Sequence, residues 1–291
     1  MAETFNSLMM ETNYLNRKRF IIGVSLLFLF AGVMMAYFLL SSLRDNQFQR
    51  PILQNQSPDP VMSSIYPSGI IDLRNWKLTL PISNSGSKGE SIDVKQPELT
   101  DYQMQPWFGV APDKKGVVFR AAVNAPTTVN SNYPRSELRE MTKDGKEEAF
   151  WPSTSGTHTL FIDEAITAVP KNKKHVVAGQ IHGDDDDLLV IRLEHPKLYL
   201  SRSKSNLVTL DDNYELGKRF SIRFVANGGR ISVYYNNSVA PVYTLEKEVN
   251  EAYFKAGVYT QSNCETEDSS SLCNDNNFGE VVIYQLNVTH A

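Results

Sequence analysis

The sequence has little of several features that would point to other classes of protein. It contains only 2 cysteines, and no histidine lies near them, which makes a metal site the weaker interpretation of that pair. The net charge of −4 gives no sign of a nucleic-acid-binding protein, although a local basic groove could still bind a polyanion. Helical hydrophobic periodicity is almost absent after residue 68, which argues against a helical bundle.

One long apolar run stands out near the N-terminus. Residues 20–40 form 21 positions without a charge, enough to cross a bilayer as a helix. Arg17-Lys18-Arg19 directly precedes this run, and the positive-inside rule places such a segment in the cytoplasm. The sequence therefore predicts a cytoplasmic segment over residues 1–19 and a transmembrane signal anchor over residues 20–40.

A cleaved signal peptide is the alternative interpretation of the same run. Its apolar region would usually be about 7–15 residues long and would be followed by small residues at a cleavage site. No Ala-x-Ala pattern follows residue 40. We therefore expect a single-pass membrane protein whose main domain is periplasmic or extracellular, with secretion after cleavage as the alternative.

Residues 41–67 are polar and rich in proline, serine, glutamine and asparagine, which predicts a flexible linker.

Outside the cytoplasm a disulfide bond can persist. Cys264 and Cys273 would close a short loop, which would stabilise the fold by about 2–3 kcal/mol. The count of cysteines alone does not prove this bond.

Residues 68–291 read as one all-β domain. Short alternating segments are separated by turn signals, and Asn227-Gly228-Gly229 is a strong hairpin signal. This pattern predicts a jelly-roll β-sandwich with a concave groove that could hold an extended polysaccharide. The expected strands are 76–80, 117–123, 135–141, 157–166, 175–181, 188–194, 197–201, 220–224, 230–235, 253–261 and 278–288.

Three of these expected strands carry polar side chains at every second position, so each set shares one face. Taken singly, each could be a solvated strand face or a surface ion-pair ladder. If the strands are neighbours, one face can bind carboxylates and carry acid–base chemistry. The positions are Arg135, Glu137, Arg139, then Gln180 and His182, then Tyr253, Lys255, Tyr259 and Gln261.

This face does not suit glycoside hydrolysis, which normally needs two carboxylates. Its single carboxylate, Glu137, lies between two arginines, so its ionised form is favoured and it is a poor general acid. We interpret residues 184–187, four aspartates, as a solvated turn rather than a calcium site. β-Elimination from a uronic acid fits better, and it requires no metal or organic cofactor. An arginine and a glutamine would stabilise the enolate-like dianion, and histidine and tyrosine would transfer protons.

The chain resembles the alginate lyases of polysaccharide lyase family seven over about residues 68–290. Four stretches occur in the order typical of that family, and the order makes the resemblance specific. They are Asp72 to Pro81 (DLRNWKLTLP), Arg135 to Arg139 (RSELR), Gln180 to His182 (QIH) and Tyr253 to Gln261 (YFKAGVYTQ).

The resemblance implies a role for each matching position. Arg135 and Gln180 would neutralise the substrate carboxylate. His182 and Tyr259 would be the base and acid pair, with Tyr259 the proton donor and the identity of the base left open. In the family, isoleucine at the position of Ile181 is associated with guluronate-containing blocks. The implied substrate-binding residues are Glu137, Arg139, Lys255 and Gln261.

We therefore expect a membrane-tethered alginate lyase that leaves an unsaturated uronate at the new chain end. Its expected partners are alginate and, through residues 20–40, a membrane, with no nucleic acid and no cofactor, and the protein is expected to be a monomer. The alternatives are a non-catalytic carbohydrate-binding module on the same fold and a lyase for another polyuronate.

Overall fold

The computed structural model describes residues 65–83, 90–183, 186–203 and 205–291. All of them belong to one structural unit, Ser64–Ala291. The predicted anchor over residues 20–40 and the linker up to residue 64 lie outside the described residues. Within the described ranges, no helix is long and apolar enough to cross a membrane.

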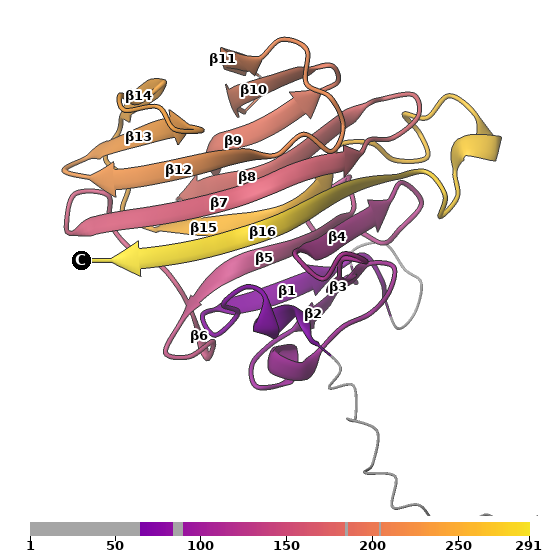
Figure 1. The fold of residues 1–291 in the computed structure, drawn as a ribbon, viewed down its shortest axis with the longest axis horizontal. Helices are drawn as coiled ribbons and strands as arrows, with labels where there is room; N and C mark the ends of the chain where they lie inside the picture. Colours follow the sequence, from indigo (N-terminus) through magenta and orange to yellow (C-terminus); the bar gives the residue numbers. More distant parts are fainter. Residues whose placement is uncertain (1–64, 84–89, 184–185, 204) are drawn as a thin grey trace, which may run out of the picture. The chain divides into compact units, whose positions relative to one another are not determined.

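Two antiparallel sheets form the described unit, as the sequence predicts for a β-sandwich (Figure 1). The nine-stranded sheet has the order β11-β10-β9-β8-β15-β5-β1-β2, with β6 paired to β5. Its strands are β1 (Trp76–Leu80), β2 (Ile92–Val94), β5 (Arg135–Thr142), β6 (Glu147–Glu148), β8 (His175–Gly183), β9 (Asp186–Glu194), β10 (Lys197–Arg202), β11 (Ser205–Asp211) and β15 (Ala252–Thr260).

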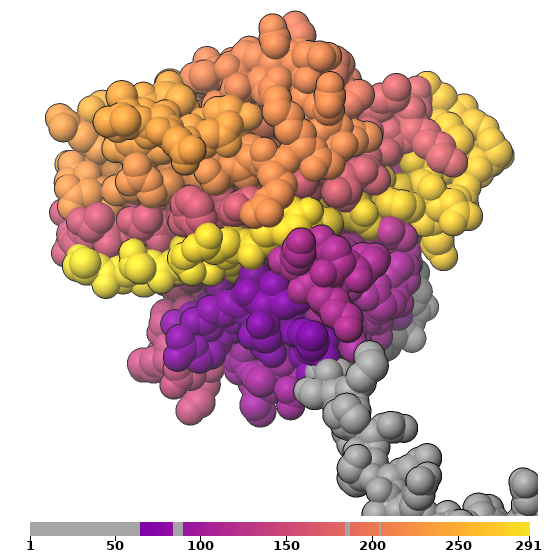
Figure 2. All heavy atoms as spheres, viewed as in Figure 1, coloured from indigo at the N-terminus to yellow at the C-terminus, as the bar shows by residue number. Residues whose placement is uncertain are grey.

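The seven-stranded sheet has the order β14-β13-β12-β7-β16-β4-β3. It faces the viewer in Figure 1, and β16 forms a continuous band of surface in Figure 2. Its strands are β3 (Phe108–Val110), β4 (Val117–Ala122), β7 (Thr157–Ala168), β12 (Phe220–Asn227), β13 (Arg230–Tyr235), β14 (Tyr243–Glu246) and β16 (Phe278–His290). Three short 3-10 helices are η1 (Pro67–Gly69), η2 (Glu98–Asp101) and η3 (Ser270–Leu272).

The core lies between the sheets and follows the predicted alternation. Leu138, Ile181 and Phe254 of the nine-stranded sheet are fully buried, as are Ile162 and Phe224 of the seven-stranded sheet. Removing such apolar side chains from water is the main force that holds two sheets together. The outer face of the nine-stranded sheet is therefore left for polar residues.

Local turn chemistry explains the β12–β13 hairpin. Gly228 and Gly229 both have positive φ, 56° and 77°, as a two-residue turn between twisted strands requires. This confirms the hairpin predicted at Asn227-Gly228-Gly229.

One local prediction is wrong. Asp186 and Asp187 do not belong to a turn, because β9 begins at Asp186 and pairs Asp187 with His182. Backbone pairing in the ladder overrides the low strand propensity of aspartate here.

Candidate active site

The three polar strands predicted from the sequence are neighbours in the nine-stranded sheet. β15 lies between β8 and β5. In the ladders, Lys255 is opposite both Arg139 and Gln180, and Tyr259 is opposite Arg135. Because residues opposite one another share a face, the register brings the predicted side chains together, with β15 in the middle.

The residues between these polar positions point into the core, as predicted. Ser136, Leu138, Ile181, Phe254 and Val258 are all fully buried. The alternation therefore fixes the polar set on the outer face of the sheet. Ile181 lies beneath that face rather than on it.

Glu137 is the centre of the charge arrangement. Arg135 Nη1 donates to Glu137 Oε2 at 2.9 Å, and Lys255 Nζ donates to the same oxygen at 3.3 Å. Gln180 Nε2 donates to Glu137 Oε1. Only 2% of the Glu137 side chain is exposed, so this carboxylate organises its three donors from beneath the surface.

Burial and charge compete at this cluster. Burial raises the pKa of the Glu137 carboxyl, but the charges of Lys255 and Arg135 outweigh it and hold the pKa below its ordinary value. Burial also lowers the pKa of the Lys255 ammonium, despite the nearby Glu137 carboxylate. The lowered pKa favours the ionised form of Glu137, as the sequence predicts, so Glu137 is a poor proton donor.

Gly257 lets β15 approach β5 closely beside Glu137. Its φ is 131°, and a Cβ at this position would lie 2.6 Å from the backbone oxygen of Ser136. A larger residue would therefore push the two strands apart. Gly257 pairs directly with Glu137 in the ladder, so this close approach lies at the centre of the site.

Tyr259 occupies one end of the polar face. The Arg135 guanidinium lies 4.0 Å from the centre of its ring, a cation–π contact. The Tyr259 hydroxyl is 2.9 Å from Ser131 Oγ, and the Tyr133 ring packs edge-on against the Tyr259 ring. Lys173 Nζ in turn donates to the Tyr133 hydroxyl at 2.8 Å.

His182 occupies the other end, where it stacks on Tyr253. The two ring centres are 5.2 Å apart with an interplanar angle of 19°. The Arg139 guanidinium lies 4.1 Å from the Tyr253 ring centre and 4.8 Å from that of Phe150. Burial raises the pKa of the Tyr253 hydroxyl. Tyr253 therefore fixes the orientation of both a candidate base and a predicted binding residue.

A second group of charges extends the face toward β1 and β2. Lys77 lies opposite Arg139 in the ladder. Its ammonium is 2.9 Å from carboxylate oxygens of both Asp93 and Glu148, and Arg139 is 3.3 Å from Glu148. The sequence pattern predicts no role for Lys77, Asp93 or Glu148.

Gln261 lies just beyond β15 and is 6% exposed. Its backbone N–H donates to the His175 carbonyl at 3.0 Å. Among the described residues, its side-chain nitrogen has no hydrogen-bond partner. Gln261 is thus buried to a degree similar to that of Arg139, which is 7% exposed.

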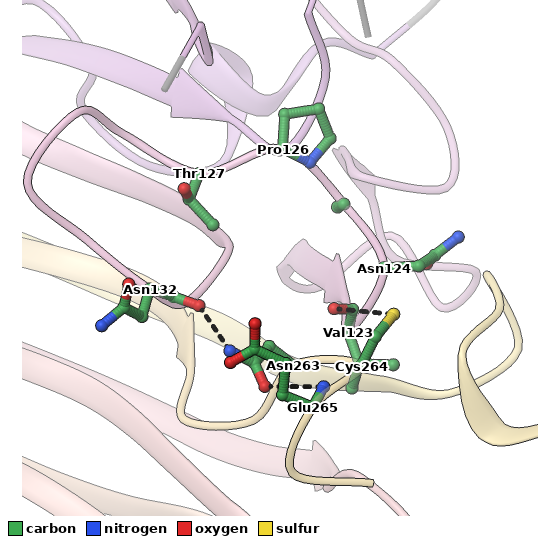
Figure 3. A pocket seen from close by; sticks show the side chains of 9 residues that line it. Val123, Asn124, Pro126, Thr127, Asn132, Asn263, Cys264 and Glu265 are labelled. Carbon is green, nitrogen blue, oxygen red and sulfur yellow. Dashed lines mark hydrogen bonds between the residues drawn. The ribbon is translucent and has the colours of Figure 1, made fainter. Parts of the chain in front are cut away.

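Cys264 and Cys273 form a disulfide bond, and the sequence prediction of this local staple is confirmed. A cavity of about 230 Å³ lies beside the bridged segment (Figure 3). None of the predicted catalytic side chains lines it. The lining residues are Val123, Asn124, Ala125, Pro126, Thr127, Asn132, Asn263, Cys264 and Glu265.

The described residues contain no group of three or more histidine, cysteine, aspartate or glutamate side chains placed to hold a metal ion. Arg135, Lys255 and Gln180 offer a cationic and amide surface for a carboxylate. His182 and Tyr259 supply groups that transfer protons. The arrangement therefore combines anion binding with acid–base chemistry on one face.

Comparison with known proteins identifies the family. Residues 71–290 match the model of an alginate lyase family. The chain is 25% identical over 290 residues to an alginate lyase of Klebsiella pneumoniae, an alignment that covers 77% of this chain and 91% of that protein.

Solved structures agree with this match. AlgAT5, an alginate lyase of polysaccharide lyase family 7, is 48% identical with a TM-score of 0.72, covering 78% of this chain and 100% of its own. An alginate lyase from Corynebacterium sp. is 44% identical with a TM-score of 0.73, covering 78% of this chain and 99% of its own. The chain therefore belongs to the alginate lyase family and is a polysaccharide lyase that cleaves alginate.

Proposed function

We propose that the outer face of β5, β8 and β15 carries this cleavage, by the mechanism typical of polysaccharide lyase family seven. The observation that carries the proposal is the register that sets Arg135, Gln180, His182 and Tyr259 on one face of three adjacent strands.

The first requirement of the reaction is to make the C5 proton of a uronate removable. That proton is α to a carboxylate, and its loss places a second negative charge on the carboxylate group. Arg135 and Gln180 bind the carboxylate and stabilise the enolate-like dianion, because fixed donors stabilise charge that develops in the transition state. Both already donate to Glu137, which holds them in place between turnovers. Glu137 is thus an organising residue beneath the substrate.

His182 and Tyr259, at the two ends of the polar face, transfer the protons. Tyr259 donates a proton to the departing glycosidic oxygen as the C4–O4 bond breaks. The base that takes the C5 proton is His182 or Tyr259 itself. Arg139 and Lys255 bind neighbouring uronates, and their cationic heads suit a polyanionic chain.

The test is the appearance of ultraviolet-absorbing unsaturated ends when the protein is incubated with alginate. The His182→Ala variant is expected to fold but to form these ends at least about 100-fold more slowly. Lys143→Ala is a matched control, since Lys143 is an exposed cation outside the polar face. Wild-type turnover by His182→Ala would remove His182 from the mechanism.

We also propose a preference for guluronate-containing blocks. It rests on Ile181, which is fully buried and would act only indirectly, through the placement of Gln180 and His182. Product profiles on purified guluronate and mannuronate blocks test this. Equal rates on both blocks would contradict it.

The cellular location that we propose for the protein rests on its sequence alone. The apolar run over residues 20–40 would anchor the protein with its N-terminus in the cytoplasm and its lyase domain outside. Sequencing the N-terminus of the mature protein tests the anchor. A mature chain that starts after about residue 41 would show that the segment is a cleaved signal peptide.

A further inference from the structure

Ser131 touches the group that the proposed mechanism uses as the acid. It lies in the loop between β4 and β5, 128 residues before Tyr259, and is 9% exposed. Its Oγ is 2.9 Å from the Tyr259 hydroxyl. The same oxygen is 2.9 Å from the carbonyl oxygen of Tyr133 and 3.1 Å from the backbone nitrogen of Tyr133.

The chemistry of these three neighbours determines which atom holds each proton. The Tyr133 carbonyl can only accept, so the single serine proton is donated to it. The Tyr133 N–H can only donate, so it takes one lone pair of Ser131 Oγ. The remaining lone pair must accept the proton of the Tyr259 hydroxyl. In this arrangement Ser131 makes every hydrogen bond it can make.

We propose that Ser131 is a positioning residue that holds the Tyr259 proton before transfer and stabilises the phenolate after it. This rests on the proposed role of Tyr259 as the acid. When the C4–O4 bond breaks, its electron pair goes to O4, the Tyr259 O–H bond breaks and O4 takes that proton. Ser131 then turns its own proton from the Tyr133 carbonyl to the Tyr259 phenolate oxygen. With His182 as the base, the proton taken from C5 returns through water to the Tyr259 phenolate before the next turnover, and Ser131 turns back.

The loop that carries Ser131 is held from two sides, which keeps its hydroxyl in place. Asn263 Nδ2 donates to the Asn132 carbonyl at 3.1 Å (Figure 3). Lys173 donates to the Tyr133 hydroxyl, as described above. Preorganisation of this kind is what makes a single hydrogen bond effective in a transition state.

The test compares three variants of the full chain. Ser131→Ala removes a hydrogen bond to a developing charge, and we expect kcat to fall by roughly 10- to 100-fold. KM should stay unchanged, because Ser131 is buried and acts through Tyr259. Ser131→Thr keeps the hydroxyl and should restore most of the lost kcat.

Thr127→Val is the matched control on the same loop. Thr127 is 5% exposed, and its hydroxyl has no hydrogen-bond partner among the described residues. Valine has nearly the same shape, so kcat and KM should both stay at wild-type values.

The outcomes separate this inference from the proposed function. A Ser131→Ala enzyme with wild-type kcat overturns the inference, and so does a loss confined to KM or a loss that Ser131→Thr does not restore. If Tyr259→Phe is inactive in the same assay, the proposed acid stands even though Ser131 falls. If Tyr259→Phe has wild-type turnover, the proposed role of Tyr259 falls, and the inference falls with it.

Discussion

Glu137→Gln tests whether the buried carboxylate holds the site together. The substitution keeps the shape but removes the charge that pairs with Arg135 and Lys255. Removing one partner of a buried ion pair costs about 3–5 kcal/mol. Since 11% of the Arg135 side chain and 13% of the Lys255 side chain remain exposed, water relieves part of this cost. We therefore expect a loss near the lower end, about 3 kcal/mol of unfolding free energy.

The pH dependence of this loss supplies a second check. Because the pKa of Glu137 in the folded protein lies below its ordinary value of 4.5, its stabilisation is present above that value. It is lost as the pH falls through the lower folded-state pKa. The difference between wild type and Glu137→Gln should therefore be full at pH 7 and shrink in acid.

Urea unfolding at several pH values measures both effects. Glu148→Gln is the control, since its carboxylate also pairs with two cations but has 46% of its side chain exposed. Such an exposed pair should contribute less than about 1 kcal/mol. Equal losses for the two variants, or a Glu137→Gln difference that persists unchanged in acid, would refute the organising role of Glu137.

Three further predictions concern stability. Gly257→Ala should cost roughly 1–3 kcal/mol in thermal unfolding, more than Gly217→Ala, whose added Cβ would meet nothing within 4 Å. Cys273→Ser should lower the free energy of unfolding by about 2–3 kcal/mol. An unchanged midpoint of thermal unfolding would contradict a stabilising role of the disulfide bond. Burial, and then the charge of Asp163, raises the pKa of Glu164 to about 8. Between about pH 4.5 and 8 Glu164 stays protonated in the folded protein but ionises in the unfolded chain, so the free energy of unfolding should fall as the pH rises. Glu164→Gln should abolish this pH dependence.

The face of each central strand could be predicted from the sequence, because alternation in a strand is dictated by backbone geometry. Arg139, Lys255 and Tyr259 therefore lie on the face expected of them. That β5, β8 and β15 are neighbours did not follow from alternation, because pairing between strands distant in sequence depends on the whole fold.

Residues from loops could not be predicted in the same way. Ser131 and Lys173 carry no periodic signal, and only the tertiary fold brings them to Tyr259 and Tyr133. The burial of the Glu137 side chain could not be predicted either, because alternation shows which face a side chain takes but not how far its neighbours cover it.

The proposed mechanism depends most on the Tyr259 hydroxyl, which would protonate the departing oxygen on this face. The most direct measurement is the initial rate of unsaturated-end formation by Tyr259→Phe at saturating alginate. Phenylalanine preserves the ring beneath the Arg135 guanidinium and removes only the hydroxyl. We expect a folded enzyme that binds alginate with kcat at least about 100-fold lower. A folded Tyr259→Phe enzyme with the wild-type kcat would contradict the account.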